Sequence, residues 1–102
     1  MAEIIKILAD LAKNVDNVSE IEILENFVRI EFEDYKICDF RGFEECGVYY
    51  MSAESTNITF EQTIDIQKAI MSSSVTVNEL GIRRDSSNGR YSFFIYFKQE
   101  NK

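Results

Sequence analysis

The sequence predicts an α+β fold: a two-layer domain in which an antiparallel sheet of five to six strands carries two helices on one face. Two observations predict it. The segments 2–15 and 60–71 repeat apolar residues every three to four positions, as amphipathic helices do. Most of the remaining chain alternates apolar and polar residues in short runs, as half-buried strands do. The 102 residues contain no low-complexity tract, so we expect one domain over 1–102, in the order α-β-β-β-β-α-β-β.

The first helix is expected over residues 2–15, with Asn14 and Asn17 as suitable residues for its end. Its polar side carries two acidic and two basic residues, namely Glu3, Lys6, Asp10 and Lys13. Its apolar stripe is formed by Ile4, Ile5, Leu8, Leu11, Ala12 and Val15. A stripe this regular is typical of a helix that packs on its own core.

Residues 20–40 favour three short strands joined by two-residue turns at 25–26 and 33–34. With these turns, Glu22 lies opposite Arg29 and Glu31 opposite Lys36, so opposite charges pair across the strands. This register predicts a core face of Ile21, Ile23, Val28, Ile30, Phe32, Tyr35 and Ile37. It places on the other face Glu22, Leu24, Phe27, Arg29, Glu31, Lys36 and Cys38.

The segment 41–45 breaks this alternation and is predicted to be a loop, followed by a fourth strand over 47–53 and a turn over 54–57. In the fourth strand, apolar residues occupy both the odd and the even positions, so either side of this strand could face the core. The residues Thr59-Phe60-Glu61-Gln62 then match a capping box. They predict a second helix from Phe60 to about Met71, with an apolar side of Phe60, Ile64, Ile70 and Met71 and with Ile66 at its edge.

The last hairpin is predicted by Ser87-Asn88-Gly89, because Asn and Gly accept the positive φ angles of a type I′ turn. The first strand of this hairpin is clearly predicted from about Leu80 onward, and Val75 and Val77 are compatible with a strand that starts earlier. A loop of two or four residues places Leu80 and Ile82 on the core face together with Phe93, Ile95 and Phe97. Parity sends Arg83, Phe94 and Tyr96 to the opposite face. Because the core does not require Phe94 and Tyr96 on that second face, these two aromatic side chains indicate a candidate binding surface.

The charge balance argues against a nonspecific binder of nucleic acid or of anionic membranes, since 18 acidic residues outnumber 11 basic ones. Residues 14–67 alone hold thirteen acidic residues against three basic ones, which suits a basic protein partner. No run approaches the roughly 20 apolar residues of a membrane span, and the first residues lack the pattern of a signal peptide. We therefore expect a cytoplasmic protein.

The residue types favour a protein that is not an enzyme and that has no cofactor and no metal site. There is no histidine, the usual acid-base group at neutral pH, and neither Cys38 nor Cys46 has an evident activating base. Two cysteines without an export signal are expected to stay reduced. The carboxylates of 31–34 followed by Lys36 resemble the arrangement of restriction-type nucleases, which leaves a metal-dependent carboxylate enzyme as the weakest alternative.

The order of the elements resembles the fold of type III secretion chaperones, which are also small and acidic. In size and charge the chain also resembles the small acidic phage proteins that block host nucleic-acid enzymes, including anti-CRISPR proteins. Our leading hypothesis is a protein-binding inhibitor module that occludes a basic, nucleic-acid-handling protein and makes no direct contact with nucleic acid. The alternative is a chaperone-like protein that forms a homodimer through the second sheet face. The candidate partner-binding residues are Phe27, Glu31, Glu33, Glu44, Glu45, Tyr49, Phe94 and Tyr96.

Overall fold

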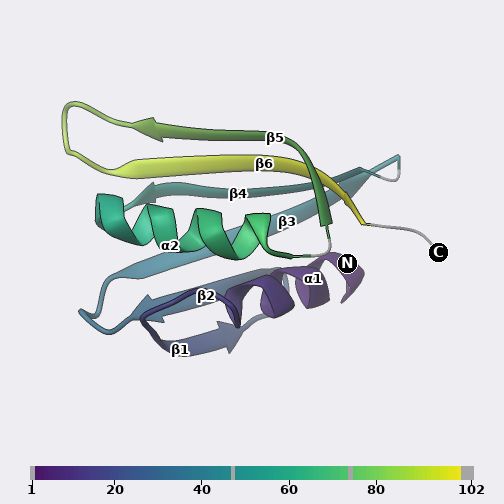
Figure 1. Cartoon of the computed structure of the whole chain (residues 1–102), viewed down its shortest axis with the longest axis horizontal. Coiled ribbons are helices and arrows are strands. Elements are labelled where there is room, and N and C mark those ends of the chain that lie inside the picture. The colour runs from purple at the N-terminus through teal and green to yellow at the C-terminus, as the bar shows by residue number, and fades with distance from the viewer. Residues whose placement is uncertain (1, 47, 74, 100–102) are drawn as a thin grey trace.

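The computed structural model describes residues 2–46, 48–73 and 75–99, and this part forms one six-stranded antiparallel sheet with two helices on one face (Figure 1). The elements in chain order are α1 Ala2–Ala12, β1 Val18–Ile23, β2 Phe27–Phe32, β3 Ile37–Glu45, β4 Val48–Thr56, α2 Phe60–Met71, β5 Val75–Arg84 and β6 Tyr91–Gln99. The expected fold class and the expected order of elements are confirmed.

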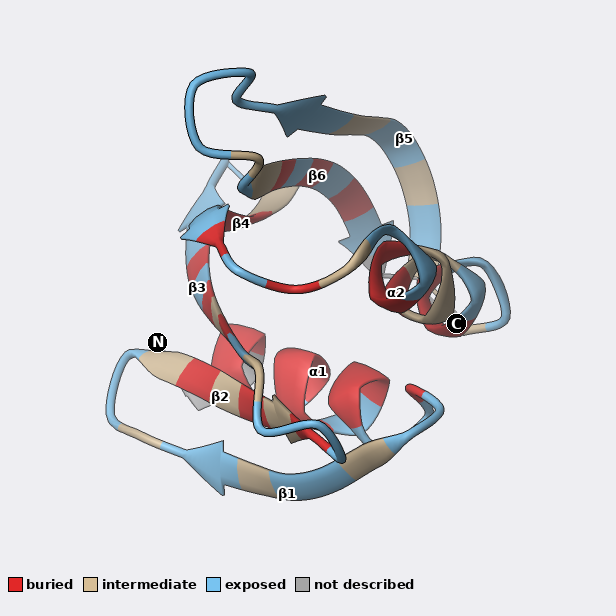
Figure 2. Ribbon diagram, turned by 90° about the vertical axis from the view of Figure 1, so that its left-hand side faces the viewer, coloured by how far each residue is buried: buried red, intermediate tan, exposed pale blue. Residues whose placement is uncertain are grey.

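The strands lie side by side in the order β1-β2-β3-β4-β6-β5, so β6 fits between β4 and β5. Helix α1 packs against β1, β2 and β3, and α2 packs against β5 and α1. The sheet curves around both helices (Figure 2). We call the face that holds the helices the inner face and the convex face opposite them the outer face.

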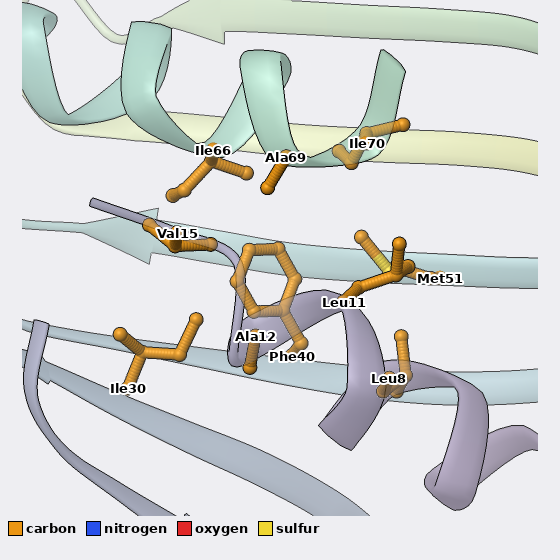
Figure 3. Close-up of a pocket in the computed structure, with 10 residues that line it drawn as sticks. All are labelled: Leu8, Leu11, Ala12, Val15, Ile30, Phe40, Met51, Ile66, Ala69 and Ile70. Atoms are coloured by element: carbon orange, nitrogen blue, oxygen red, sulfur yellow. The ribbon is translucent and has the colours of Figure 1, made fainter. Parts of the chain in front are cut away.

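The core lies between the helices and the inner face. Its most deeply buried side chains are Ile4, Val28, Ile30, Phe32, Cys38, Ile66, Ile70, Phe93, Ile95 and Phe97. A gap of about 10 Å³ remains between α1, α2 and the sheet, with Phe40 near its centre (Figure 3). Every residue that lines this gap is apolar, and the volume is about that of one water molecule, so it is an ordinary packing defect.

The first hairpin has the predicted register. Ile21 lies opposite Ile30, and Glu22 lies opposite Arg29. Val28 and Ile30 are buried under α1, as expected. Ile23 is exposed although it has core parity, because it lies at the end of the edge strand β1.

The second hairpin departs from the prediction by one residue. Its loop has three residues rather than two: the amide of Phe32 donates to the carbonyl of Lys36, and Tyr35 takes a positive φ of 72°. The Asp34 carboxylate accepts a hydrogen bond from the Lys36 amide, which stabilises the longer turn. Glu31 therefore pairs with Ile37, and the expected pair of Glu31 with Lys36 is wrong.

A one-residue slip exchanges the two faces of a strand. Cys38 and Phe40 are buried in the core, whereas Ile37 is exposed on the outer face. Tyr35 is 81% exposed at the turn. The predictions that Tyr35 and Ile37 belong to the core and that Cys38 faces outward are wrong for this reason.

The segment 41–45 is the second half of β3 and not a loop. Gly42 interrupts the sequence pattern because α1 lies directly on it: a Cβ atom at Gly42 would overlap the side chain of Ile4 and touch that of Leu8. Strand β4 likewise extends through the predicted turn to Thr56, with a bulge where Ser55 takes a positive φ of 55°. The two strands are thus longer than their patterns indicate.

Helix α2 has the predicted bounds and the predicted capping box. The Gln62 amide donates to the Thr59 hydroxyl at 3.1 Å, and the Thr59 amide donates to the Gln62 side chain at 2.9 Å. Its predicted apolar side is wrong at both ends, since Phe60 and Met71 are exposed. The buried side is instead formed by Gln62, Thr63, Ile66, Ala69 and Ile70. Thr63 tolerates burial because its hydroxyl donates to the Phe60 carbonyl at 2.6 Å.

The remaining boundaries shift less. Helix α1 ends at Ala12 rather than at residue 15, and Val15 is nevertheless buried after it. In the last hairpin the Asp85 amide donates to the Arg90 carbonyl, which leaves a four-residue loop over 86–89. Gly89 takes a positive φ of 74° as expected, but Asn88 does not, so the predicted type I′ turn is wrong. Leu80 lies opposite Ile95 and Ile82 opposite Phe93, which confirms that these residues share one face, although Ile82 stays 37% exposed.

Candidate functional site

Four aromatic side chains form a row across the outer face, from β3 over β4 to β6. The row consists of Phe43, Tyr50, Tyr96 and Phe94. Phe43 lies directly opposite Tyr50, and Tyr50 lies directly opposite Tyr96. Their ring centroids are 5.4 Å and 4.8 Å apart, close to the spacing of neighbouring strands, so the strand pairing itself brings the rings together. We call these four residues the aromatic row.

The row ends at β5, where the ring of Phe94 covers Gly81. A Cβ atom at Gly81 would overlap that ring. Phe94 also meets Tyr96 edge-on, with 6.1 Å between the ring centroids. Phe43, Phe94 and Tyr96 remain 47%, 38% and 37% exposed, and no helix of the described chain lies over them (Figure 2). The outer face thus presents a continuous aromatic surface to its surroundings.

A second cluster lies beside the row, on β2 and β3. The Arg29 guanidinium binds the Asp39 carboxylate in a two-pronged pair, with Nε to Oδ1 at 2.7 Å and Nη2 to Oδ2 at 3.1 Å. The hydrogen bond and the charge of Asp39 raise the pKa of Arg29 above its ordinary value. The guanidinium groups of Arg29 and Arg41 lie 5.7 Å and 5.6 Å from the centroid of the Phe27 ring.

Three shallow hollows surround the aromatic row, and Tyr50 lines all of them. The first, of about 360 Å³, is lined by Phe43, Glu45, Val48, Tyr50 and Tyr96. We call it the Glu45 hollow. The other two share Glu54 as well as Tyr50 and also contain an arginine each, Arg41 in one and Arg83 in the other. Each hollow therefore combines aromatic rings with at least one carboxylate.

The structure brings together only part of the predicted site. Phe27, Glu31, Glu45, Phe94 and Tyr96 share the outer face. Those placed elsewhere are Glu33 in the β2–β3 turn, Glu44 opposite Tyr49, and Tyr49 itself, whose ring meets the buried Phe97 on the inner face. The acidic residues at 31 and 33 lie near one end of β3 and those at 44 and 45 at its other end, roughly 26 Å apart by strand rise.

Sequence reasoning missed two members of the aromatic row. The predicted loop over 41–45 includes Phe43, because that segment breaks the alternation of the preceding strands. The pattern gives no direction for Tyr50, because its strand is apolar at both parities. A signal for Phe43 was present: the alternation of apolar Cys38 and Phe40 with polar Asp39 and Arg41 continues through Gly42. Following that period would have placed Phe43 outward.

The two cysteines and Asp34, the side chains considered for catalysis or metal binding, lie in different environments. Burial of Cys38 raises the pKa of its thiol well above its ordinary value, which disfavours the reactive thiolate. Cys46 is exposed between β3 and β4. Asp34, part of the nuclease-like run, accepts hydrogen bonds from the Lys36 amide and from the Gln62 side chain, so it ties the β2–β3 turn to the start of α2. Within residues 2–46, 48–73 and 75–99, no three His, Cys, Asp or Glu side chains are grouped so as to hold a metal ion.

None of the helices described here is long and apolar enough to span a membrane. Comparison of the chain with protein-family models, with curated proteins and with solved structures gives no match.

Proposed function

We propose that this protein is a non-enzymatic binding module that attaches to a protein partner through its outer sheet face and occludes it. The observation that carries the proposal is the aromatic row, which is exposed on the one broad face that the helices leave open. Aromatic residues that are surrounded by polar ones are the typical anchors of protein interfaces.

The size of the row supports this function. An aromatic side chain offers about 200 Å² of surface. The exposed fractions of 47%, 38% and 37% for Phe43, Phe94 and Tyr96 then correspond to roughly 250 Å², to which Tyr50 adds. Together with a charged rim, such a patch suits the centre of an interface that buries about 800 Å² on each partner.

The charge supports a basic partner. The chain carries a net charge of −7, and Glu45, Glu54 and Glu79 share the outer face with the row. A basic surface that normally holds nucleic acid is complementary to this protein, and long-range attraction would speed the encounter. We accordingly place the protein among inhibitors of the phage anti-CRISPR type, in the cytoplasm, with a protein rather than nucleic acid as its direct partner.

Affinity capture from the native host, followed by binding measurements with the purified partner, tests the proposal. The double variant Tyr50→Thr/Tyr96→Thr removes two rings and keeps the strand propensity of both positions. Tyr35→Asn is the control, because Tyr35 is exposed at the β2–β3 turn, away from the row, and asparagine tolerates the positive φ of this position. We expect the wild type and the control to bind equally and the double variant to lose binding at least tenfold. Equal binding by all three proteins would contradict the outer-face module.

A homodimer is the second candidate. The outer face carries both signs of charge, with Arg83 and Lys98 as well as Glu54 and Glu79, so two copies related by a twofold axis could pair opposite charges while the rings stack. Sedimentation at concentrations up to about millimolar decides this. A dimer that Tyr50→Thr/Tyr96→Thr dissociates supports the candidate, and a monomer throughout rejects it.

A further inference from the structure

The geometry points to the Glu45 hollow as a site for an arginine side chain of the partner, in which the guanidinium lies against the rings of Tyr50 and its neighbours and pairs with the carboxylate of Glu45. This inference rests on the proposed function and adds the chemistry of the partner residue to it.

The same face already holds an arginine in this manner. Arg29 lies 5.7 Å from the centroid of the Phe27 ring and forms two hydrogen bonds, of 2.7 Å and 3.1 Å, with Asp39. A guanidinium on this sheet thus contacts one aromatic ring and one carboxylate together, and it does so with only partial burial, since both charged side chains stay close to two-fifths exposed.

The Glu45 hollow repeats these groups without a cation of its own. It offers three rings, Phe43, Tyr50 and Tyr96, and one carboxylate. Among the described residues, Glu45 takes part in no ion pair, and the arginines that lie over an aromatic ring both lie over Phe27. The volume of about 360 Å³ is ample for a guanidinium group and the stem that carries it. With neighbouring ring centroids 5.4 Å and 4.8 Å apart, a cation in the hollow can lie within about 6 Å of more than one ring.

An arginine fits this hollow better than a lysine does. Its planar guanidinium can stack on an aromatic ring while it donates two parallel hydrogen bonds to a carboxylate, and it loses less hydration than a compact ammonium group. Glu45 is exposed at the end of β3, so its carboxylate is free to meet an incoming side chain.

Titration of the full-length chain with N-acetyl-arginine amide, followed by backbone amide chemical shifts, tests the site. The uncharged isostere N-acetyl-citrulline amide and the lysine analogue N-acetyl-lysine amide are the comparison probes. We expect saturable shifts centred on Phe43, Glu45, Tyr50 and Tyr96 with the arginine probe and several-fold weaker binding of both other probes. Equal binding of citrulline overturns the cation site, and equal binding of lysine overturns the assignment to arginine.

Variants complete the test. Glu45→Gln should weaken the arginine probe roughly three- to tenfold, because one ion pair and the attraction of one charge are lost. Glu61→Gln removes the same charge from the exposed start of α2 and should leave the probe affinity unchanged. Loss of affinity in both variants, or in neither, overturns the site.

Partner capture separates this inference from the proposed function. If Glu45→Gln captures the partner as the wild type does while Tyr50→Thr/Tyr96→Thr does not, the binding module stands and the arginine site fails. If the double variant also captures the partner normally, the binding module itself fails. A several-fold loss in Glu45→Gln together with a larger loss in the double variant supports both.

Discussion

The ring of Phe94 in β6 lies directly over Gly81 in β5, its cross-strand partner. An aromatic ring over a strand glycine supplies the side-chain contact that glycine lacks, and here it also fixes the end of the aromatic row. Gly81 is therefore a part of the outer face, although it has no side chain of its own.

The first prediction concerns this pair. Gly81→Ala should destabilise the fold by about 1 kcal/mol, because the new methyl group displaces the Phe94 ring from its contact with Tyr96. In a Phe94→Ala background the same substitution should be neutral or stabilising, since alanine suits a strand better than glycine does. Urea unfolding of the four proteins in this double-mutant cycle measures the coupling. A coupling near zero would show that the ring does not depend on the glycine.

The second prediction concerns Gly42, where α1 approaches β3. Gly42→Ala should cost more than Gly81→Ala, about 2–3 kcal/mol, because the obstacle is the buried side chain of Ile4 rather than a partly exposed ring. Removing both γ carbons of Ile4 should relieve the cost, so Gly42→Ala should be less harmful in an Ile4→Ala background than in the wild-type background. Thermal unfolding of both pairs provides the measurement, and equal costs in the two backgrounds would contradict the contact.

The two hairpins of the meander show how much of this fold the sequence could predict. The pair of Ile21 with Ile30 was predictable, because apolar and charged pairs agree on one register there. The next hairpin offers the same apparent agreement, yet its loop is one residue longer because the Asp34 carboxylate takes up the Lys36 amide. A hydrogen bond within the turn thus outweighs a surface charge pair, which contributes only a few tenths of a kcal/mol. The alternation of apolar and polar residues does not show which of these two interactions is stronger, so it could not predict the longer loop.

Only the β6 half of the aromatic row, Phe94 and Tyr96, was predictable from the sequence. Parity against Leu80 and Ile82 places Phe94 and Tyr96 outward whatever the loop length. For Tyr50, local pattern gives no direction, because its neighbour Tyr49 is equally able to fill a core. What decides is the long-range contact of Tyr49 with Phe97, which exists only after β4 and β6 have paired.

The third prediction is a pH dependence at Asp34. Burial favours the neutral carboxyl, but the hydrogen bonds from the Lys36 amide and the Gln62 side chain outweigh it, and the pKa of Asp34 lies below its ordinary value. Because the pKa of Asp34 is lower in the folded state, the unfolded chain binds more protons at this residue than the folded chain does as the pH falls. The contribution to stability is therefore complete above the unfolded pKa of about 4 and is lost as the pH falls through the folded one.

Asp34→Asn should accordingly flatten the fall of the unfolding midpoint between about pH 5 and pH 3. Glu61→Gln, which removes a carboxylate from the exposed start of α2, serves as the control for net charge. Thermal melts at several pH values give the slopes. An unchanged slope in Asp34→Asn would mean that this carboxylate contributes nothing to acid sensitivity.

The fourth prediction concerns the two thiols. Cys38 is fully buried beneath α1, and burial holds its pKa well above the ordinary value, whereas Cys46 is exposed. A thiol reagent at neutral pH should modify one cysteine per chain in the native protein and two in concentrated urea. Mass spectrometry after proteolysis should identify the native site as Cys46. Fast native modification of Cys38 would contradict the register of β3.

The last prediction uses the separation of the acidic residues along β3. Because residues 31 and 33 lie at one end of that strand and residues 44 and 45 at the other, a single basic patch on a partner does not engage both pairs equally. Glu45 adjoins the aromatic row, so Glu44→Lys/Glu45→Lys should weaken partner binding at least tenfold, through a lost ion pair and new like-charge repulsion. Glu31→Lys/Glu33→Lys changes the net charge by the same amount and should cost less than threefold at physiological salt, where exposed charges more than about 8 Å apart are largely screened from each other. Equal losses in the two variants would show that overall charge, rather than the aromatic row and its rim, determines the affinity.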